Sequence, residues 1–514
     1  MSSRRAIIAA VVTVLILAVV LSPAFDQGLN DRQRMGTLSI LGTLESAIVA
    51  AAPALDGETT DSVWSEATAI TITVNGGANT AGSTQITLKS VFYEDSIYFV
   101  AQWADSQDSR DRFPWFYNTT SSQWEQKGNT TSGDDNTYYE DKLAMFWNIG
   151  DTIAGFNDDG CFVTCHVGTP SKHYTNAGGE LADMWHWKRV RTGAVGQIDD
   201  QYMDNTTYNP VTAKEAGRKS DPKTAGGYSD NKVTLSYADV PSESTTIPKA
   251  WIPGAAAGTD DYYWILNGDL GVRAFNFTHV YKSNGTLIDE VGNVLESPTE
   301  TAHIPGIIVS AFTGDRGNIS AASKWATNQW TLEFGRKLVT GSQYDVQYEN
   351  TGAAARYYFG ISTFNNAQID HSIHANVYAL AFEQPNTAPG TPTIDVDSLT
   401  VRVDEVVTFS VSATDPDGDT LTYSWQFGDG ATGSGASVTH SYDEAETYIV
   451  NVTASDGKGG TSTTSVTIVV EDESDAGGLS TTTLAILALA AIVLIAVAAV
   501  FLMKRKKTPP TGQH

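Results

Sequence analysis

The sequence predicts an all-β protein with a large β-sandwich, a small β-sandwich and a C-terminal transmembrane helix. Three features predict this architecture. Short runs of alternating apolar and polar residues fill residues 53–385, and a Pro-rich linker at 386–392 separates them from a second β-rich region at 393–470. An unbroken apolar stretch at 483–503 follows, and a basic tail comes directly after it.

The alternating runs of the large region are rich in β-branched and aromatic residues, and Gly, Asn and Asp interrupt them, which is typical of antiparallel strands. No long amphipathic helix stands out between the two ends of the chain. Two polar stretches, 105–137 and 193–232, are expected to be long inserted loops, which in compact domains are more often functional than idle. We expect strands at 70–74, 86–92, 96–103, 262–266, 330–334 and 357–361.

The two hydrophobic ends predict export and anchoring. Residues 1–25 place two arginines before an apolar run, which is the pattern of a signal peptide or of an uncleaved N-terminal anchor. The stretch 483–503 is long enough, at about 1.5 Å per residue, to cross a bilayer. Its basic tail, 504–514, is expected in the cytoplasm, and 471–482 is expected to be a linker. These features predict a single-pass protein of the cell membrane with a large extracellular part.

The chain of 514 residues carries a formal net charge of −27. Nucleic-acid binding needs a basic face that replaces phosphate counterions, so this class of function is excluded. Such acidity fits a soluble, self-repelling outer surface. Seven Asn-X-Ser/Thr triplets, at Asn118, Asn129, Asn205, Asn276, Asn284, Asn318 and Asn451, are compatible with an exported glycoprotein.

The small β region contains a recognisable series of motifs. Trp425-Gln-Phe-Gly-Asp-Gly430 is followed by His440-Ser-Tyr442 and by Tyr448-Ile-Val-Asn-Val452. This series resembles the polycystic kidney disease (PKD) repeat, an immunoglobulin-like sandwich, and the resemblance implies a spacer or adhesion role. Trp425 is expected in the core, with a glycine turn after it.

An acidic turn precedes this motif. Asp415, Asp417 and Asp419 alternate along it. Alternate carboxylates in a turn can bind Ca²⁺, and they can equally form a solvated turn without an ion.

The two cysteines of the chain, Cys161 and Cys165, lie directly before His166. In the C-x-x-C-H motif two thiols bond the haem vinyl groups and the adjacent histidine binds iron; here the spacer is three residues. The pattern favours a covalent c-type haem with His166 as an iron ligand. A disulfide beside a non-covalent b-type haem, a disulfide without haem and a site for another metal are the alternatives. Zinc is disfavoured, because a closed site wants four ligands.

A second histidine lies in an expected strand, in the run Ala182-Asp-Met-Trp-His-Trp-Lys188. Alternation places His186 on one face with Met184 and Lys188, and it places Trp185 and Trp187 on the other. His186 is therefore a candidate second axial ligand of a haem iron, and the alternative is a hydrogen-bonded core histidine.

Several segments of the large region form an ordered series: Leu55-Asp-Gly-Glu58, Glu140-Asp-Lys-Leu-Ala-Met-Phe-Trp147, Asp183-Met-Trp-His-Trp-Lys188 and Trp330-Thr-Leu-Glu-Phe334. This series resembles the haem-binding domain of the ethylbenzene and dimethylsulfide dehydrogenase gamma subunits. The resemblance implies a β-sandwich that holds one haem and relays electrons outside the membrane. Those subunits bind a b-type haem through Met and Lys, whereas this chain has a Cys-Cys-His loop. Further candidate ligands are therefore Met184 and Met145, and more weakly His173, His303, Lys324 and His371.

The sequence thus predicts an electron-transfer protein rather than an enzyme, with a redox partner protein or membrane electron carrier and possible membership of an oxidoreductase complex. The rival hypothesis is a carbohydrate-binding or adhesion protein without haem, in which exposed aromatic side chains stack on sugars. Its candidates are Trp115, Phe116, Tyr117 and Trp124. The carboxylate pairs at 134–135, 158–159 and 199–200 are expected to be solvated, and no catalytic residues are predicted.

Overall fold

The computed structural model describes residues 40–128, 137–165, 172–289, 294, 303–374 and 376–472. The chain divides into two compact units, residues 1–384 and 385–514. Within the described ranges, no helix is long and apolar enough to cross a membrane. The expected N-terminal segment, transmembrane helix and tail lie outside the described residues.

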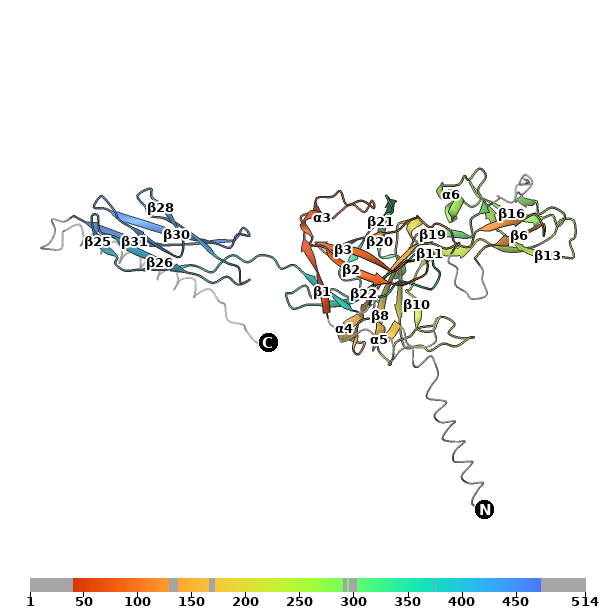
Figure 1. Cartoon of the computed structure of the whole chain (residues 1–514), viewed down its shortest axis with the longest axis horizontal. Helices are drawn as coiled ribbons and strands as arrows, with labels where there is room; N and C mark the ends of the chain where they lie inside the picture. The colour runs from red at the N-terminus through yellow and green to blue at the C-terminus, as the bar shows by residue number, and fades with distance from the viewer. Residues whose placement is uncertain are drawn as a thin grey trace, which may run out of the picture. The chain divides into compact units, whose positions relative to one another are not determined.

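Among the described residues, unit 1 is built on a twelve-stranded sheet (Figure 1). The strand order is β10-β9-β8-β7-β22-β23-β1-β3-β4-β21-β20, with β2 paired to β3. The strands are β1 (Ile40–Ile48), β2 (Ile70–Asn75), β3 (Ser83–Tyr93), β4 (Ser96–Ala104), β7 (Lys142–Asn148), β8 (Ala182–Lys188), β9 (Asp199–Met203), β10 (Arg218–Ser220), β20 (Ser320–Ala326), β21 (Gln329–Lys337), β22 (Tyr357–Phe364) and β23 (Val377–Phe382).

The sheet folds onto itself as a sandwich around an aromatic core. The ring centroids of Trp185 and Phe99 are 5.7 Å apart, and those of Trp187 and Trp330 are 5.1 Å apart. These contacts join the β7–β8 half to the β4–β21 half, so the predicted large sandwich is present. Strand β1 lies between the halves, parallel to both β23 and β3, and it starts before the boundary at residue 53 expected from the sequence.

Five of the six expected strands are confirmed, and the sixth is wrong. Residues 262–266 were expected to form one strand, but α6 (Asp260–Tyr263) ends there and β15 (Ile265–Leu266) follows. The backbone N–H of Trp264 donates to the carbonyl of Asp260, which closes a helical turn that alternation of aromatic residues does not reveal.

The two expected loop inserts also contain strands, so their prediction as loops is wrong. Strands β5 and β6 occur in the first, and β9, β10 and β11 occur in the second. Their polar composition is compatible with strands because β5, β9 and β11 pair with strands outside the inserts, while β6 pairs with β5 and β10 pairs with β9. The smaller sheets of unit 1 are β18-β5-β6, β11-β19-β15, β12-β13 and β14-β16-β17, formed by β5 (Trp115–Asn118), β6 (Gln123–Gln126), β11 (Ala225–Asp230), β12 (Val233–Ser236), β13 (Ser244–Ile247), β14 (Ala250–Trp251), β16 (Phe275–Val280), β17 (Leu287–Asp289), β18 (His303–Ile304) and β19 (Ile307–Thr313).

Helices are short in the described part of unit 1. They occur at turns between strands and add little to the core. They are α3 (Val63–Glu66), η1 (Ile149–Asp151), α4 (Phe156–Asp159), α5 (Phe162–Cys165), η2 (Gly193–Val195), α6 (Asp260–Tyr263), η3 (Asn267–Asp269) and η4 (Asp315–Gly317).

Unit 2 is a β-sandwich of two sheets within its described residues, as the PKD-like motifs predict. Trp425 is buried in its core, and Gly428 adopts φ +94° where an added Cβ would lie 2.8 Å from a backbone oxygen. The sheets are β24-β26-β29 and β25-β31-β30-β27-β28, formed by β24 (Thr393–Val396), β25 (Thr400–Arg402), β26 (Val407–Ser412), β27 (Thr422–Gln426), β28 (Thr432–Ser434), β29 (Ser437–His440), β30 (Thr447–Ser455) and β31 (Thr461–Glu471).

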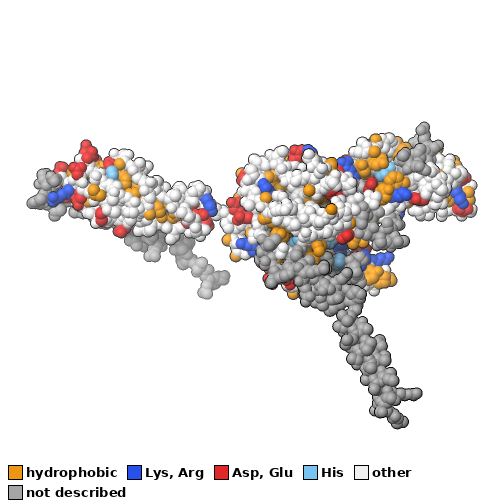
Figure 2. Space-filling model, in the orientation of Figure 1, with side chains coloured by type: hydrophobic (Ala, Val, Ile, Leu, Met, Phe, Trp, Pro, Cys, Tyr) orange, Lys and Arg blue, Asp and Glu red, His pale blue; other side chains and the backbone are white. Residues whose placement is uncertain are grey.

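The acidity of the chain does not mark one binding surface on the face seen in Figure 2. Acidic side chains are spread there over both units, with polar and hydrophobic side chains between them. Candidate sites therefore have to be found from local geometry.

Candidate functional site

Strand β8 lies inside one half of the sandwich, and all seven of its residues are buried. The predicted alternation is confirmed, because Trp185 and Trp187 belong to the aromatic core while Met184 packs in a separate apolar cluster. His186 shares the Met184 side by the period-two geometry of a strand. We call this second surface of β7, β8 and β22 the outer face.

Cross-strand register arranges the outer face in three rows. His186 pairs with Ala144, and Ala144 pairs with Ser362. Because Ala144 and Ser362 are small and only half-buried, the ring of His186 borders the most open part of this face. The rows are His186–Ala144–Ser362, Met184–Phe146–Gly360 and Lys188–Lys142–Phe364.

His186 is the least satisfied polar group of the outer face. It is 5% exposed, and its ring stacks on Phe364 with 5.4 Å between centroids. Neither ring nitrogen has a hydrogen-bond partner among the described residues. Burial, and then the charges of Lys188 and Lys142, lower the pKa of His186 well below its usual value. The imidazole is therefore neutral, with a lone pair available to a metal. Among the described residues it lacks the hydrogen bonds that the alternative of a hydrogen-bonded core histidine would show.

Cys161 lies against the outer face beside β22, in the segment that carries α4 and α5 (Figure 1). A Cβ placed on Gly360 would lie 3.0 Å from the Sγ of Cys161, which is tighter than most Cβ contacts, so any larger residue here presses on the cysteine side chain. The backbone of Cys165 ends α5, whereas its side chain and the whole of His166 lie outside the described residues. The structure thus brings Cys161, Met184 and His186 to one face.

We expect Gly360→Ala to displace the cysteine segment, because an added methyl group overpacks this contact. Overpacking a buried site typically costs about 1–3 kcal/mol. Urea unfolding measures the loss, and Gly268→Ala is the control, since nothing lies within 4 Å of the Cβ position at Gly268. Equal stability of the two variants would show that the Cys161 contact is loose.

The other predicted ligands are dispersed. Met145 is fully buried in the aromatic core on the opposite side of the sheet from His186. Lys324 is exposed on β20 and forms an ion pair with Glu58. His303 stacks on Tyr262 at 3.8 Å, away from the twelve-stranded sheet.

Two further histidines from the sequence prediction lie closer to the candidate face. His371 contacts the ring of Phe364 at 5.1 Å, and its Nδ1 is 2.8 Å from the carbonyl oxygen of Ser372. His173 lies beyond α5, and its carbonyl accepts from the backbone of Gly217. Of these two, the structure brings His371 to the same aromatic ring as His186.

Sequence reasoning missed Lys142, which lies on the outer face in the row next to His186. Its Nζ is 3.8 Å from the centroid of Phe364 and donates to the carbonyl of Gln368 at 2.9 Å. Burial, and then Arg191, lower its pKa well below the usual lysine value. Alternation along the strand that ends at Trp147 could have placed Lys142 beside Ala144 and Phe146.

Comparison with known families fits this arrangement. Residues 61–376 match the family described as ethylbenzene dehydrogenase, and this match covers more than half of the chain. The chain belongs to the ethylbenzene dehydrogenase family. Residues 387–471 of this family member match the PKD domain. Unit 1 is thereby an oxidoreductase-related domain, followed by a PKD domain.

Individual relatives resemble short parts of the chain. Collagenase ColA of Clostridium perfringens (strain 13 / Type A) is 32% identical over 113 residues, which is 20% of this chain and 10% of the collagenase. The PKD1 domain of Vibrio anguillarum Epp is 33% identical and covers 17% of this chain and 99% of its own, with a TM-score of 0.15. A structure titled as carbohydrate-binding modules of the β-sandwich superfamily is 30% identical and covers 18% and 37%, with a TM-score of 0.17. This chain spans about a tenth of the length of the collagenase.

The prediction that these aromatic side chains are exposed and stack on sugars is wrong for this family member. Trp115, Tyr117 and Trp124 are each no more than 6% exposed. They form a small core with Phe277, because the hairpin β5–β6 folds against β16 and β17. The alternating pattern does not distinguish a buried aromatic face from an exposed one.

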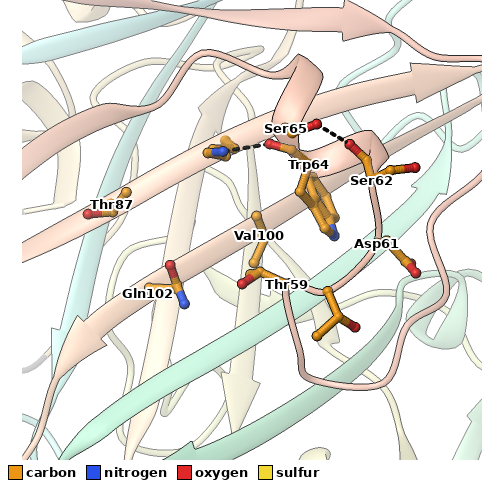
Figure 3. A pocket seen from close by; sticks show the side chains of 10 residues that line it. Thr59, Asp61, Ser62, Trp64, Ser65, Thr87, Val100 and Gln102 are labelled. Carbon is orange, nitrogen blue, oxygen red and sulfur yellow. Dashed lines mark hydrogen bonds between the residues drawn. The ribbon is translucent and has the colours of Figure 1, made fainter.

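A pocket of about 300 Å³ opens beside α3 on strands β3 and β4 (Figure 3). Thr59, Ser62, Thr87 and Gln102 line it together with Trp64. Trp64 is 2% exposed and its indole N–H donates to Glu333 at 2.7 Å, so its ring is not presented to a ligand. The pocket contains none of the candidate haem ligands.

The carboxylate pair at 199–200 was expected to be solvated, and this prediction is wrong. Both side chains are fully buried, because β9 pairs with β8 inside the sheet. Although burial opposes ionisation, Lys188 and Arg316 lower the pKa of Asp199 to about 2.

The acidic turn of unit 2 brings its carboxylates together. Single oxygens of Asp415, Asp417 and Asp419 lie within 4.8 Å of one another, which is compatible both with a calcium site and with a solvated turn without an ion.

Proposed function

We propose that unit 1 holds a haem against the outer face and that the protein transfers electrons without catalysing a reaction of its own. The observation that carries this proposal is His186, a buried, neutral imidazole whose two nitrogens have no partner in the described part of the chain. Such a group is expected to have a ligand, since buried polar atoms in native proteins are nearly always satisfied. A bound haem iron would supply one-electron oxidation and reduction.

The residues of this face fit a haem. His186 would bind the iron, and Phe146 and Phe364 would give the macrocycle apolar neighbours. Cys161 and Cys165 would form thioether bonds in a c-type haem, with His166 as the other iron ligand. In a b-type haem, Met184 is the neighbouring soft ligand on the same face.

The surroundings of His186 would tune such a centre. The nearby ammonium group of Lys188 is paired with Asp199, which also accepts from Arg316 at 2.6 Å. This pairing limits the positive charge around the imidazole. Hydrogen bonding, burial and neighbouring charge are the properties through which a protein sets a haem potential.

The remaining features of the proposal come from the ends of the chain and from the family. The C-terminal apolar stretch would anchor the protein in the cell membrane, with the PKD domain between the anchor and the haem domain. Membership of the ethylbenzene dehydrogenase family supports a redox partner protein or an oxidoreductase complex. A membrane electron carrier is the other candidate partner.

The experiment is a pyridine haemochrome spectrum of the purified full-length protein, with haem staining of a denaturing gel. A c-type α-band with a stained polypeptide supports covalent haem on Cys161 and Cys165. A b-type band without staining supports a non-covalent haem and leaves the cysteines to a disulfide. A protein without haem after expression with haem-maturation machinery contradicts the proposal.

That last result would favour the second candidate function, a surface adhesion protein. The PKD domain is the observation that favours it, because such domains serve as spacers and in adhesion. The burial of the aromatic residues expected to bind sugars counts against carbohydrate as its ligand.

A further inference from the structure

Four buried aspartates lie on the inner side of β8 and β9, on the opposite side of the sheet from His186. Asp183 belongs to β8 and Asp200 to β9, while Asp221 follows β10 and Asp345 lies beyond β21. Each is at most 3% exposed. One oxygen from each of Asp183, Asp200 and Asp345 lies within 4.8 Å of the other two, which is a separation that one bound ion can bridge.

In Asp183 and Asp345, hydrogen-bond donors contact only one of the two carboxylate oxygens. The backbone N–H of Val346 donates to Asp183 Oδ2 at 2.9 Å. Arg336 and Asn318 donate to Asp345 Oδ2 at 3.1 and 2.9 Å. The Oδ1 atoms of Asp183 and Asp345 are buried without a partner among the described residues. Each carboxylate is therefore oriented by its Oδ2 and keeps its Oδ1 for another ligand.

Asp200 and Asp221 are less satisfied still. All four of their carboxylate oxygens are buried and have no hydrogen-bond partner in the described ranges. Asp221 lies beside Asp345, close enough for the charge of each carboxylate to act on the other. The guanidinium of Arg336 acts on Asp183, Asp200 and Asp345, and together with it the four carboxylates carry a formal charge of −3. Uncompensated charge of this kind is costly in a protein interior unless it pairs or binds a metal.

We propose that Asp183, Asp200 and Asp345 bind one calcium ion inside the sandwich, with Asp221 beside Asp345 as a further oxygen donor. Calcium takes six to eight oxygen ligands at about 2.3–2.6 Å in flexible geometry, and carboxylates are its usual protein ligands. The described cluster offers only oxygen atoms, whereas zinc and copper prefer nitrogen and sulfur. Magnesium demands near-ideal octahedral geometry and keeps several waters, which suits a buried four-carboxylate cluster less well.

The competing state is a metal-free cluster in which the carboxyl groups are protonated. Burial raises the pKa of Asp183 to about 7, and burial with the neighbouring Asp345 raises the pKa of Asp221 to about 9. Calcium binding would displace those protons. This site does not depend on the proposed haem, because it lies on the other side of the sheet and uses other residues.

The test uses the full-length protein and terbium, which replaces calcium and luminesces when nearby tryptophan is excited. Trp185 is a suitable sensitiser, since the guanidinium of Arg336 lies 4.9 Å from its ring. Because the cluster is fully buried, the protein is unfolded and refolded in EGTA before titration. The background variant is Asp417→Asn, which disables the exposed acidic turn of unit 2.

We expect the Asp417→Asn protein to bind one terbium ion per chain, with calcium displacing it. Adding Asp200→Asn is expected to weaken binding at least tenfold. If that double variant does not fold, Asp221→Asn decides in its place, and a tenfold weakening there supports the site. Absence of terbium luminescence in the Asp417→Asn protein overturns the proposal, as does unchanged affinity in a folded Asp200→Asn or Asp221→Asn protein.

Discussion

Replacing His186 by alanine is expected to remove most of the bound haem or to convert its spectrum to high spin. The imidazole is the buried group of the outer face that has no hydrogen-bond partner in the described structure, so an iron ligand is the role that explains it. Loss of groups that merely support a metal ligand costs about 10–100-fold in affinity. Loss of the ligand itself should cost about 100-fold or more. The Soret absorbance per polypeptide and the haemochrome content measure the effect.

Two further variants separate ligation from folding. His303→Ala is the matched control, because His303 stacks on Tyr262 outside the twelve-stranded sheet and should leave the spectrum unchanged. His186→Met keeps the volume and supplies a sulfur ligand, so haem is expected to remain with an altered spectrum. A His186→Ala protein that is folded by circular dichroism and has the wild-type spectrum would remove His186 from the site.

The faces of β8 could be predicted from the sequence because a strand has a fixed period. Indole rings at 185 and 187 can only share one side, and once that side fills the core, His186 must lie on the other. The same logic failed to classify Asp199 and Asp200. From the sequence alone, two adjacent carboxylates predict a solvated loop. The structure differs because β9 pairs with β8, where Arg316 lies beside Asp199 and Arg336 lies near Asp200.

What escaped prediction depends on contacts between segments distant in sequence. Whether the nitrogens of His186 have hydrogen-bond partners depends on all the residues packed around the ring, so a local sequence pattern cannot predict that they have none among the described residues. The tight packing at Gly360 comes from Cys161, about two hundred residues earlier in the chain. Buried aromatic residues of the β5–β6 hairpin were mistaken for a sugar-binding surface for the same reason, since their covering strands come much later.

Replacing Arg336 by methionine is expected to be the most destabilising single change in unit 1. The side chain of Arg336 is fully buried and its guanidinium donates to Asp345 at 3.1 Å, while Asp183 lies 3.6 Å away. Removing one partner of a buried ion pair costs about 3–5 kcal/mol, because the remaining charge is left uncompensated. Urea unfolding in EGTA measures the loss without the contribution of bound calcium.

The neighbouring Lys337→Met is the control for this change. Lys337 and its partner Asp95 are both 67% exposed, and such surface pairs contribute little to stability. A comparable loss in the two variants would mean that the position on β21, rather than the buried charge, sets the cost.

The deficit of Arg336→Met should also grow with pH. Burial raises the pKa of Asp183 to about 7 even though Arg336 opposes this rise, so the variant should have a still higher value. A carboxyl group whose pKa is raised by folding stabilises the folded state while it is protonated, and that stabilisation is lost as the pH rises through the raised pKa. The free energy of unfolding of the variant should therefore fall further below wild type at pH 8 than at pH 5. An equal deficit at both values would show that Asp183 and its neighbours do not titrate against Arg336, and that the arginine contributes through packing on Trp185 and Tyr348 instead.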